Sequence, residues 1–279
     1  MNLMKKIVLL LIFTGFLISC NKKNYASRTQ SFPQVETKVE QLPEKENLWV
    51  FILAGQSNMA GRGFVEPQDT VPSERILTIN KAGEIILAKE PLHFYEPTMA
   101  GLDCGLSFGK ELVKQLPDSV SVLLLPAAVG GSSILQWLGD STFRNVPLFS
   151  NFEEKVQIGK NYGTIKGILW HQGENDAGTQ ETIDPYRSRL AQLLTQFRHT
   201  IGNEKLPIII GKLASFSKNN ENWQQINRQI ERYVASDKYA SLIETSDLKD
   251  KGDQVHFNSV GLREMGQRYA NAYLNLFGN

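Results

Sequence analysis

From Leu48 onward, short apolar runs alternate with longer stretches in which apolar residues recur every three or four positions. Five of the runs are continuous in their hydrophobicity, a pattern that favours strands buried on both faces of a sheet. These runs are LWVFIL (48–53), VSVLLLP (120–126), IKGILW (165–170), LPIIIGKL (206–213) and ASLIET (240–245). We therefore expect the folded domain to begin near Leu48 and to contain a parallel sheet.

The stretches between these runs have the periodicity of helices that pack one face against a sheet. Helices are expected at 106–116, at 185–201 between Asp184 as N-cap and Gly202 as the stop, at 223–234 and after Ser259. Strands that alternate with helices predict an α/β fold, here a three-layer α/β/α sandwich with a mainly parallel five-stranded sheet.

Polar, glycine-rich sequence follows three of the predicted strands. AGQSNMAG follows the first strand, AAVGGSSI the second and HQGEND the third. Because parallel sheets bind ligands at the carboxyl ends of their strands, these three segments are expected to meet in one site. Ser57, the glycine pair Gly130 and Gly131, and Gln172 are the candidate residues that they contribute.

A serine nucleophile requires a base, and the chain has four histidines. His256 follows Asp253 by three residues, so the carboxylate could hold Nδ1–H and leave Nε2 free to accept a proton. The spacing alone also fits a turn capped by Asp253 with His256 on the surface. His93 has no obvious acid partner, and His171 could be a ligand, a packing residue or a substrate contact.

Composition and charge narrow the class of protein. The chain has 279 residues, of which 41% are apolar and 21% charged, as is ordinary for a globular protein. Its formal net charge of +1 argues against a nucleic-acid partner, which would require a concentrated basic surface.

The N-terminus is different in character. Lys5 and Lys6 precede an apolar run at 7–18 that is shorter than a membrane-spanning helix and typical of a signal peptide. The run ends in LISC (17–20), which resembles the lipobox of bacterial lipoproteins. The resemblance implies cleavage before Cys20, lipidation of Cys20 and a lipid anchor in the bacterial cell envelope, periplasmic or surface-exposed. An ordinary secretory signal with an incidental cysteine is the alternative.

The expected domains follow from this reading. They are a lipoprotein signal peptide (1–19), the lipidated cysteine with a flexible tether (20–47) and the folded domain (48–279). The tether is polar and contains Pro33 and Pro43. If Cys20 carries lipid, Cys104 has no disulfide partner and is expected to be a small buried residue. The membrane is expected to be contacted only through the anchor.

The four segments GQSN, GG, HQGE and DQVH together resemble the ordered blocks of the SGNH-hydrolase superfamily. More narrowly, LAGQSNMAGRG with WHQGEND resembles the carbohydrate esterases that include acetylxylan esterases of family 6 and sialate O-acetylesterases. The similarity runs from about Leu48 to the end of the chain. The absence of a glycine two residues after Ser57 separates this pattern from the G-x-S-x-G turn of α/β-hydrolases.

The resemblance implies a role for each block. Ser57 matches the nucleophile, His256 the general base and Asp253 its orienting acid. The backbone N–H groups of Ser57 and Gly131, together with the side-chain amide of Gln172, match the oxyanion hole.

Other residues would support this machinery. Gly130 is expected to allow close approach of the backbone to the ligand. Glu174 is expected to hold its loop by pairing with Arg62, or alternatively to orient the catalytic groups. The resemblance implies no metal or other cofactor.

The sequence thus predicts a serine esterase that removes O-acetyl groups from oligo- or polysaccharides, in the manner of acetylxylan esterases. A sialate O-acetylesterase, a hydrolase that uses Glu174, Asp176 and His171 with or without a metal, and a non-catalytic glycan-binding lipoprotein are the alternatives. Selectivity is expected from the loops at 62–100 and 139–162. Trp137 is expected either to stack on a sugar or to pack in the interior.

Overall fold

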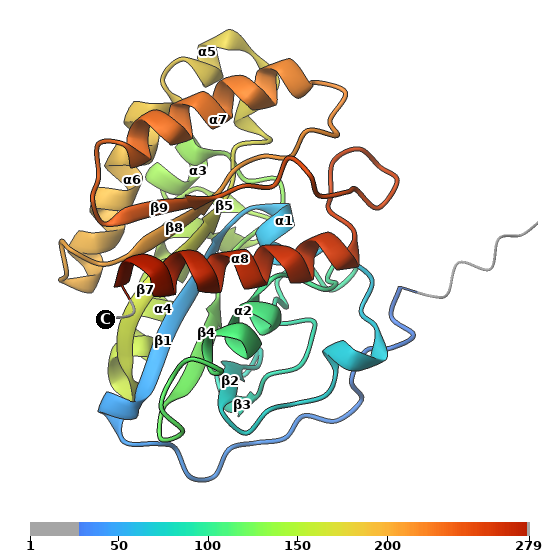
Figure 1. Ribbon diagram of the computed structural model, residues 1–279, viewed down its shortest axis with the longest axis vertical. Helices are drawn as coiled ribbons and strands as arrows, with labels where there is room; N and C mark the ends of the chain where they lie inside the picture. The colour runs from blue at the N-terminus through green and yellow to red at the C-terminus, as the bar shows by residue number, and fades with distance from the viewer. Residues whose placement is uncertain (1–27, 278–279) are drawn as a thin grey trace, which may run out of the picture.

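The computed structural model describes residues 28–277. Its central layer is a seven-stranded sheet in the order β3-β2-β4-β1-β7-β8-β9 (Figure 1). The strands are β1 (Leu48–Gly55), β2 (Ile76–Ile79), β3 (Ile85–Leu87), β4 (Ser121–Pro126), β7 (Thr164–His171), β8 (Ile208–Gly211) and β9 (Ala240–Ile243). All neighbours pair in parallel except β3, which is antiparallel to β2. The α/β sandwich with a mainly parallel sheet is confirmed.

The sheet is larger than the five strands that were expected. The additional strands β2 and β3 are only four and three residues long. They lie inside the segment 62–100, which was expected to be a loop. Runs this short do not stand out from irregular sequence, although β2 is buried along its whole length.

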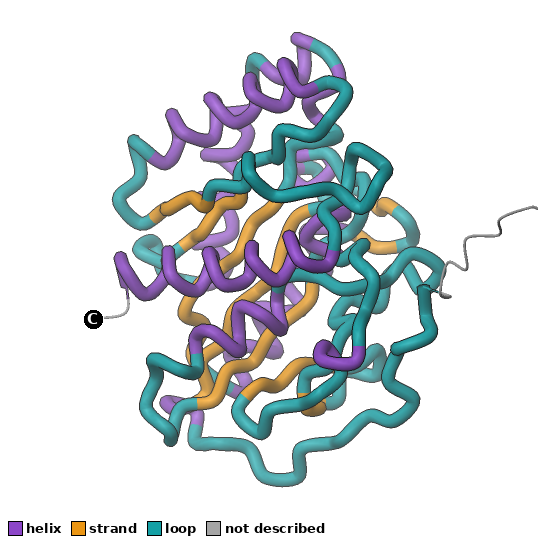
Figure 2. The backbone as a smooth tube through the Cα atoms, turned by 45° about the vertical axis from the view of Figure 1, so that its right-hand side comes forward, coloured by secondary structure: helices purple, strands orange, loops and turns teal. Residues whose placement is uncertain are grey.

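The longer helices lie on both sides of the sheet (Figure 2). The helices α2 (Gly105–Leu112) and α8 (Ser259–Phe277) pack together on one face, and α4 (Leu148–Tyr162) packs against β1, β4 and β7. The helix α6 (Tyr186–Ile201) contacts α4 and α7 (Asn220–Val234). The expectation of a loop at 139–162 is therefore wrong, because α4 occupies most of it.

Shorter elements connect these. They are η1 (Lys45–Asn47), α1 (Ser57–Ala60), η2 (Pro67–Asp69), α3 (Ile134–Leu138), β5 (Thr142–Phe143), β6 (Val146–Pro147), η3 (Asp176–Gly178) and α5 (Gln180–Ile183). Asp184 is the C-cap of α5 and not the N-cap of α6, a position that Pro185 takes. Gly202 ends α6 with φ of 76°, as expected.

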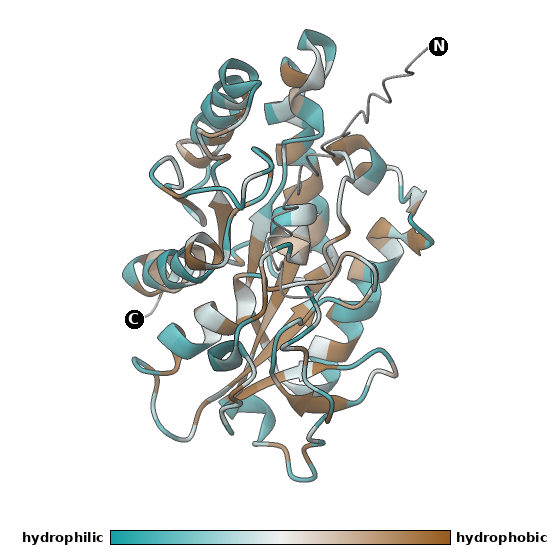
Figure 3. Ribbon diagram, turned by 90° about the vertical axis from the view of Figure 1, so that its right-hand side faces the viewer, coloured by the Kyte–Doolittle hydropathy of each residue, from teal (hydrophilic) through white to brown (hydrophobic). Residues whose placement is uncertain are grey.

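The strands form the apolar interior, and the helices present polar outer faces (Figure 3). Trp137 belongs to this interior, since it is 0% exposed and makes an edge-to-face contact with Trp170 at a centroid distance of 5.5 Å. Trp137 therefore packs and is not placed to stack on a sugar. No helix within residues 28–277 is long and apolar enough to cross a bilayer.

The segment before the sheet is not a free tether over its described part, residues 28–47, which runs alongside the sheet (Figure 1). Val39 N–H donates to Ile85 O at 3.1 Å and Leu87 N–H donates to Thr37 O at 2.9 Å. The apolar side chains of Phe32, Val39 and Leu42 pack against the core. The expectation of a flexible tether is therefore wrong for this part, whereas the signal peptide and Cys20 lie outside the described residues.

Candidate active site

The turn between β1 and Ser57 requires glycine at position 55. Gly55 has φ of 138°, and a Cβ atom there would lie 2.1 Å from the carbonyl oxygen of His171. The next residue, Gln56, donates its N–H to that same carbonyl at 2.9 Å. The chain then enters the short helix α1, so that Ser57 lies at the carboxyl end of the central strand.

The three residues expected to form a catalytic triad lie in contact. His256 Nε2 is 3.0 Å from Ser57 Oγ, and His256 Nδ1 is 2.8 Å from Asp253 Oδ2. The other oxygen of Asp253 accepts the backbone N–H groups of Val255 and His256 at 3.0 and 2.8 Å. The carboxylate is thereby held in place, and it orients the imidazole toward a serine 199 positions earlier in the chain.

The electrostatic environment keeps this histidine in the form that a general base requires. Burial lowers the pKa of His256, Asp253 raises it, and the positive charges of Lys251 and Arg62 lower it further, with a net decrease. Burial would raise the pKa of Asp253, but its bonds to His256 and to backbone N–H groups bring that pKa down to about 2. At neutral pH the imidazole is therefore neutral and the carboxylate is charged.

Asn58, which was assigned no role from the motifs, links the catalytic segments. It is 1% exposed, and its Nδ2 donates to Glu174 Oε1 at 2.6 Å and to Val255 O at 3.1 Å. Its Oδ1 accepts Phe257 N–H at 3.1 Å. One amide thus ties the serine turn to both sides of His256. Its position directly after the serine was the only sequence signal for this role.

Glu174 does not pair with Arg62, so that expectation is wrong. Its Oε1 accepts from Asn58 and lies 3.2 Å from His171 Nε2. Burial would raise the pKa of Glu174, but His171 and the amide outweigh this effect and lower it. Arg62 instead donates to Glu96 Oε2 at 2.7 Å. Glu174 therefore holds Asn58 in place. This contact is closer to the alternative expectation, in which Glu174 orients the catalytic groups.

Ser57 and Gly131 are the residues expected to supply backbone N–H donors to the oxyanion. Gly131 has φ of 81° and lines the same cavity as Ser57. Neither the Ser57 nor the Gly131 N–H donates to another group within residues 28–277. The Gly130 N–H, in contrast, is occupied by Glu96 Oε2 at 2.7 Å. These observations are consistent with the oxyanion donors assigned to Ser57 and Gly131 and with a supporting role for Gly130.

Gln172 lies deeper than expected. It is 0% exposed, and its Nε2 donates to Asp176 Oδ2 at 2.5 Å and to Ser132 O at 3.1 Å. It does not line the cavity. The structure therefore contradicts direct donation from Gln172 to an oxyanion, because Asp176 Oδ2 and Ser132 O take the two hydrogens of its amide.

The catalytic cavity has a volume of about 260 Å³. Its lining residues are Gln56, Ser57, Arg62, Met99, Gly130, Gly131, Arg144, Glu174, Asn175, Val255 and His256. Arg144 comes from the β5–β6 turn, forms an ion pair from its Nη1 to Glu96 Oε1 and leaves 38% of its side chain exposed. The remaining N–H groups of a guanidinium at the cavity wall can bind a carboxylate or sugar oxygens.

His93 and Cys104 are both buried. His93 does have an acid partner, because its Nδ1 lies 2.7 Å from Asp103 Oδ2 in the interior. Neither residue lines the catalytic cavity. Cys104 is buried and free, as expected, and burial raises the pKa of its thiol well above the ordinary value.

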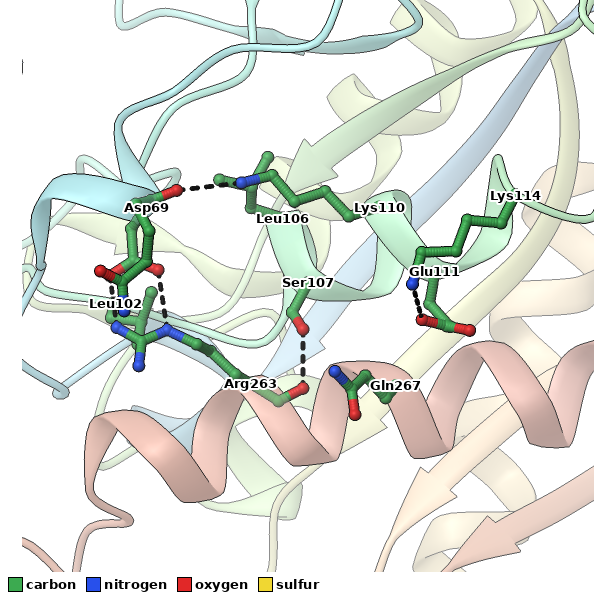
Figure 4. A pocket seen from close by; sticks show the side chains of 10 residues that line it. Asp69, Leu102, Leu106, Ser107, Lys110, Glu111, Lys114, Arg263 and Gln267 are labelled. Carbon is green, nitrogen blue, oxygen red and sulfur yellow. Dashed lines mark hydrogen bonds and ion pairs between the residues drawn. The ribbon is translucent and has the colours of Figure 1, made fainter.

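A second cavity, of about 290 Å³, lies between α2, α8 and η2 (Figure 4). Arg263 is paired with Asp69 and Lys114 with Glu111, and Lys110 donates to the backbone oxygen of Gln68 at 3.0 Å. No catalytic residue lines it. Within residues 28–277, no three His, Cys, Asp or Glu side chains are placed to hold a common metal ion, so His171, Glu174 and Asp176 do not form such a group.

Fold and site together define an SGNH-type hydrolase, and comparison with known proteins identifies the family. Residues 47–275 match the family described as carbohydrate esterase, sialic acid-specific acetylesterase. The chain belongs to this family. The resemblance drawn from the GQSN, GG, HQGE and DQVH segments is thus confirmed.

Individual relatives agree with this assignment. The chain is 29% identical over 250 residues to an Arabidopsis thaliana protein named probable carbohydrate esterase At4g34215, covering 82% of this chain and 91% of that one. The X-ray structure of the Arabidopsis protein superposes with a TM-score of 0.72 at 26% identity, covering 83% and 99% of the two chains.

More distant structures share the fold. NanS superposes with a TM-score of 0.67 at 17% identity, covering 85% of this chain and 99% of that one. XAC1771, a carbohydrate acetylesterase from Xanthomonas citri, gives a TM-score of 0.61 at 19% identity, covering 84% and 57%. These two structures show the shared fold, and the family match over residues 47–275 makes the chain a carbohydrate esterase by family.

Proposed function

We propose that the protein is a serine esterase that removes O-acetyl groups from carbohydrates through an acetyl-enzyme. The observation that carries this proposal is the chain of contacts from Ser57 Oγ through His256 to Asp253, at 3.0 and 2.8 Å. A serine, a base and an orienting acid in this order are the parts that acyl transfer requires.

In the first half-reaction, Ser57 Oγ attacks the ester carbonyl carbon and His256 Nε2 accepts the hydroxyl proton. The carbonyl oxygen becomes an oxyanion, which the N–H groups of Ser57 and Gly131 stabilise. As the ester bond breaks, His256 returns the proton to the departing sugar hydroxyl. Water then attacks the acetylated serine with the same base and releases acetate.

For the substrate, we propose an acetylated oligo- or polysaccharide, in the manner of acetylxylan esterases. The resemblance of LAGQSNMAGRG and WHQGEND to the group that includes acetylxylan esterases of family 6 supports this choice. A sialate O-acetylesterase is the second candidate. It is supported by the partly exposed guanidinium of Arg144 and by the description of the family.

Acetate release tests both the reaction and the substrate. Wild-type protein is assayed side by side on acetylated xylan, 9-O-acetylated sialic acid and 4-nitrophenyl acetate, with Ser57→Ala as the control. Faster release from xylan supports the first candidate, and faster release from the sialic acid supports the second. No release from any of the three would contradict the proposed reaction.

We also propose that the protein is lipid-anchored through Cys20 in a bacterial cell envelope, with residues 1–19 as its signal peptide. The proposal rests on the apolar run at 7–18 and on LISC (17–20). Metabolic labelling with a radioactive fatty acid, with Cys20→Ser as the control, tests it. Equal labelling of both chains would contradict lipidation at this cysteine, and proteolysis of intact cells would show which side the domain occupies.

A further inference from the structure

Gln56, the residue before the nucleophile, has an amide of defined orientation. Its Oε1 accepts the backbone N–H of Asn175 at 3.2 Å. A backbone N–H is always a donor, so the atom that it contacts must be the amide oxygen. The same Oε1 lies 3.2 Å from Gln172 Nε2, which the acceptors Asp176 Oδ2 and Ser132 O identify as nitrogen.

The other end of the amide therefore faces the cavity. Gln56 is only 3% exposed, yet it lines the catalytic cavity beside Ser57 and Gly131. Its Nε2 donates to no group within residues 28–277. Because it is not one of the buried side-chain nitrogens that lack a partner, this nitrogen is accessible to solvent. The oxygen of this nearly buried amide accepts from the backbone of Asn175, and its NH₂ group is left with its donors toward the reacting ester.

We propose that Gln56 Nε2 is the third donor of the oxyanion hole, in place of Gln172. As the bond between Ser57 Oγ and the carbonyl carbon forms, the π-electron pair moves to the carbonyl oxygen and the hydroxyl proton goes to His256 Nε2. The Gln56 amide then donates to the developing oxyanion together with the backbone N–H groups of Ser57 and Gly131. This inference rests on the proposed serine-esterase reaction.

Gln172 does not contact the ester and acts as a positioning residue for the Gln56 amide. Tyr186 Oη lies 2.8 Å from the main-chain carbonyl oxygen of Gln172 and 3.1 Å from its Oε1, and Gln172 Nε2 lies 3.2 Å from Gln56 Oε1. These contacts hold the Gln172 amide with its nitrogen beside the oxygen of Gln56. A preorganised donor of this kind needs no rotation when charge develops on the ester oxygen.

The test compares steady-state kinetics of 4-nitrophenyl acetate hydrolysis among matched variants. Gln56→Glu keeps the shape and the accepting oxygen but replaces the donor with an acceptor, and Gln56→Met removes the donor without adding charge. Gln267→Met, at an exposed position on α8 among the residues of Figure 4, is the control for the substitution itself. Thermal unfolding of each variant identifies any that does not fold.

The expected result is a loss of about 10²-fold in kcat for both Gln56 variants with KM changed less than about threefold. A loss of less than about tenfold in kcat for a folded variant, or an effect confined to KM, would overturn the proposal, because Gln56 would then contact only the sugar. Gln172→Met serves as the comparison. If it lost kcat while Gln56→Met did not, Gln172 would be the donor. An inactive wild-type protein would instead defeat the proposed function.

Discussion

His256 must be neutral to accept the proton of Ser57, and its surroundings set the pKa below which it becomes charged. Burial, Lys251 and Arg62 together lower its pKa below the ordinary 6.5 despite Asp253. Because the neutral form is the active one, kcat/KM should rise with pH and reach half its plateau below pH 6.5. A pH profile of 4-nitrophenyl acetate hydrolysis measures this midpoint. A midpoint clearly above that value would show that the imidazole is charged in the resting enzyme.

Lys251 offers a way to move that midpoint. Its Nζ lies 3.5 Å from Asp253 Oδ2, and its charge lowers the pKa of His256. Lys251→Gln should therefore raise the pKa of His256 and shift the acid limb of the profile upward by a few tenths of a pH unit, roughly the size of a partly screened charge effect.

Lys249→Gln, at an exposed lysine two residues earlier, is the matched control and should leave the profile unchanged. Equal shifts in the two variants would mean that net charge, and not the position of Lys251, sets the pKa.

At the scale of elements, the site is assembled from three loops, and Asn58 contacts all of them. Its amide joins α1 to Glu174 after β7 and to the backbone on both sides of His256. Asn58→Ala should lower kcat by roughly 10- to 100-fold, because a small displacement of the base is costly.

The same variant should lower the free energy of unfolding by about 1–3 kcal/mol, since buried partners lose their hydrogen bonds. Kinetics and chemical denaturation measure the two effects, with Asn203→Ala at an exposed position as the control. Unchanged kcat in the folded Asn58→Ala variant would contradict a positioning role.

The segment 28–47 covers the edge strand β3 and so protects its backbone groups from pairing elsewhere. Val39 packs on the core, whereas Val35 is 70% exposed. Val39→Asp should therefore lower the free energy of unfolding by about 1–2 kcal/mol, and Val35→Asp should have almost no effect. Denaturant titration of the two variants measures the difference. Equal stabilities would mean that the segment does not stabilise the domain.

At the scale of the whole molecule, the sequence predicted the features whose signal lies within one segment or in the order of the motifs along the chain. The buried strands carried continuous apolar runs, and Asp253 and His256 share one loop, so the triad followed once Ser57 was placed at a strand end. Contacts between distant loops could not be read in this way. Arg62 pairs with Glu96 and Glu174 with His171, not with each other. His93 contacts Asp103 from an irregular segment.

The oxyanion hole shows the same limit most clearly. A family block placed an amide at Gln172, but the direction of that amide depends on which of several acceptors competes for it. In the folded chain Asp176 and Ser132 take its hydrogens and leave Gln56 facing the cavity. Only the complete hydrogen-bond network determines that outcome.

The central claim is that Ser57 is a nucleophile activated by His256. Reaction with diethyl 4-nitrophenyl phosphate followed by peptide mass spectrometry tests it most directly, because this ester phosphorylates activated serines and the adduct is stable. We predict one diethylphosphoryl group on Ser57, loss of esterase activity in proportion to labelling, and no such label in His256→Ala. Esterase activity that survives complete labelling of Ser57, or a wild-type enzyme that is active but is labelled no faster at Ser57 than His256→Ala, would contradict the account.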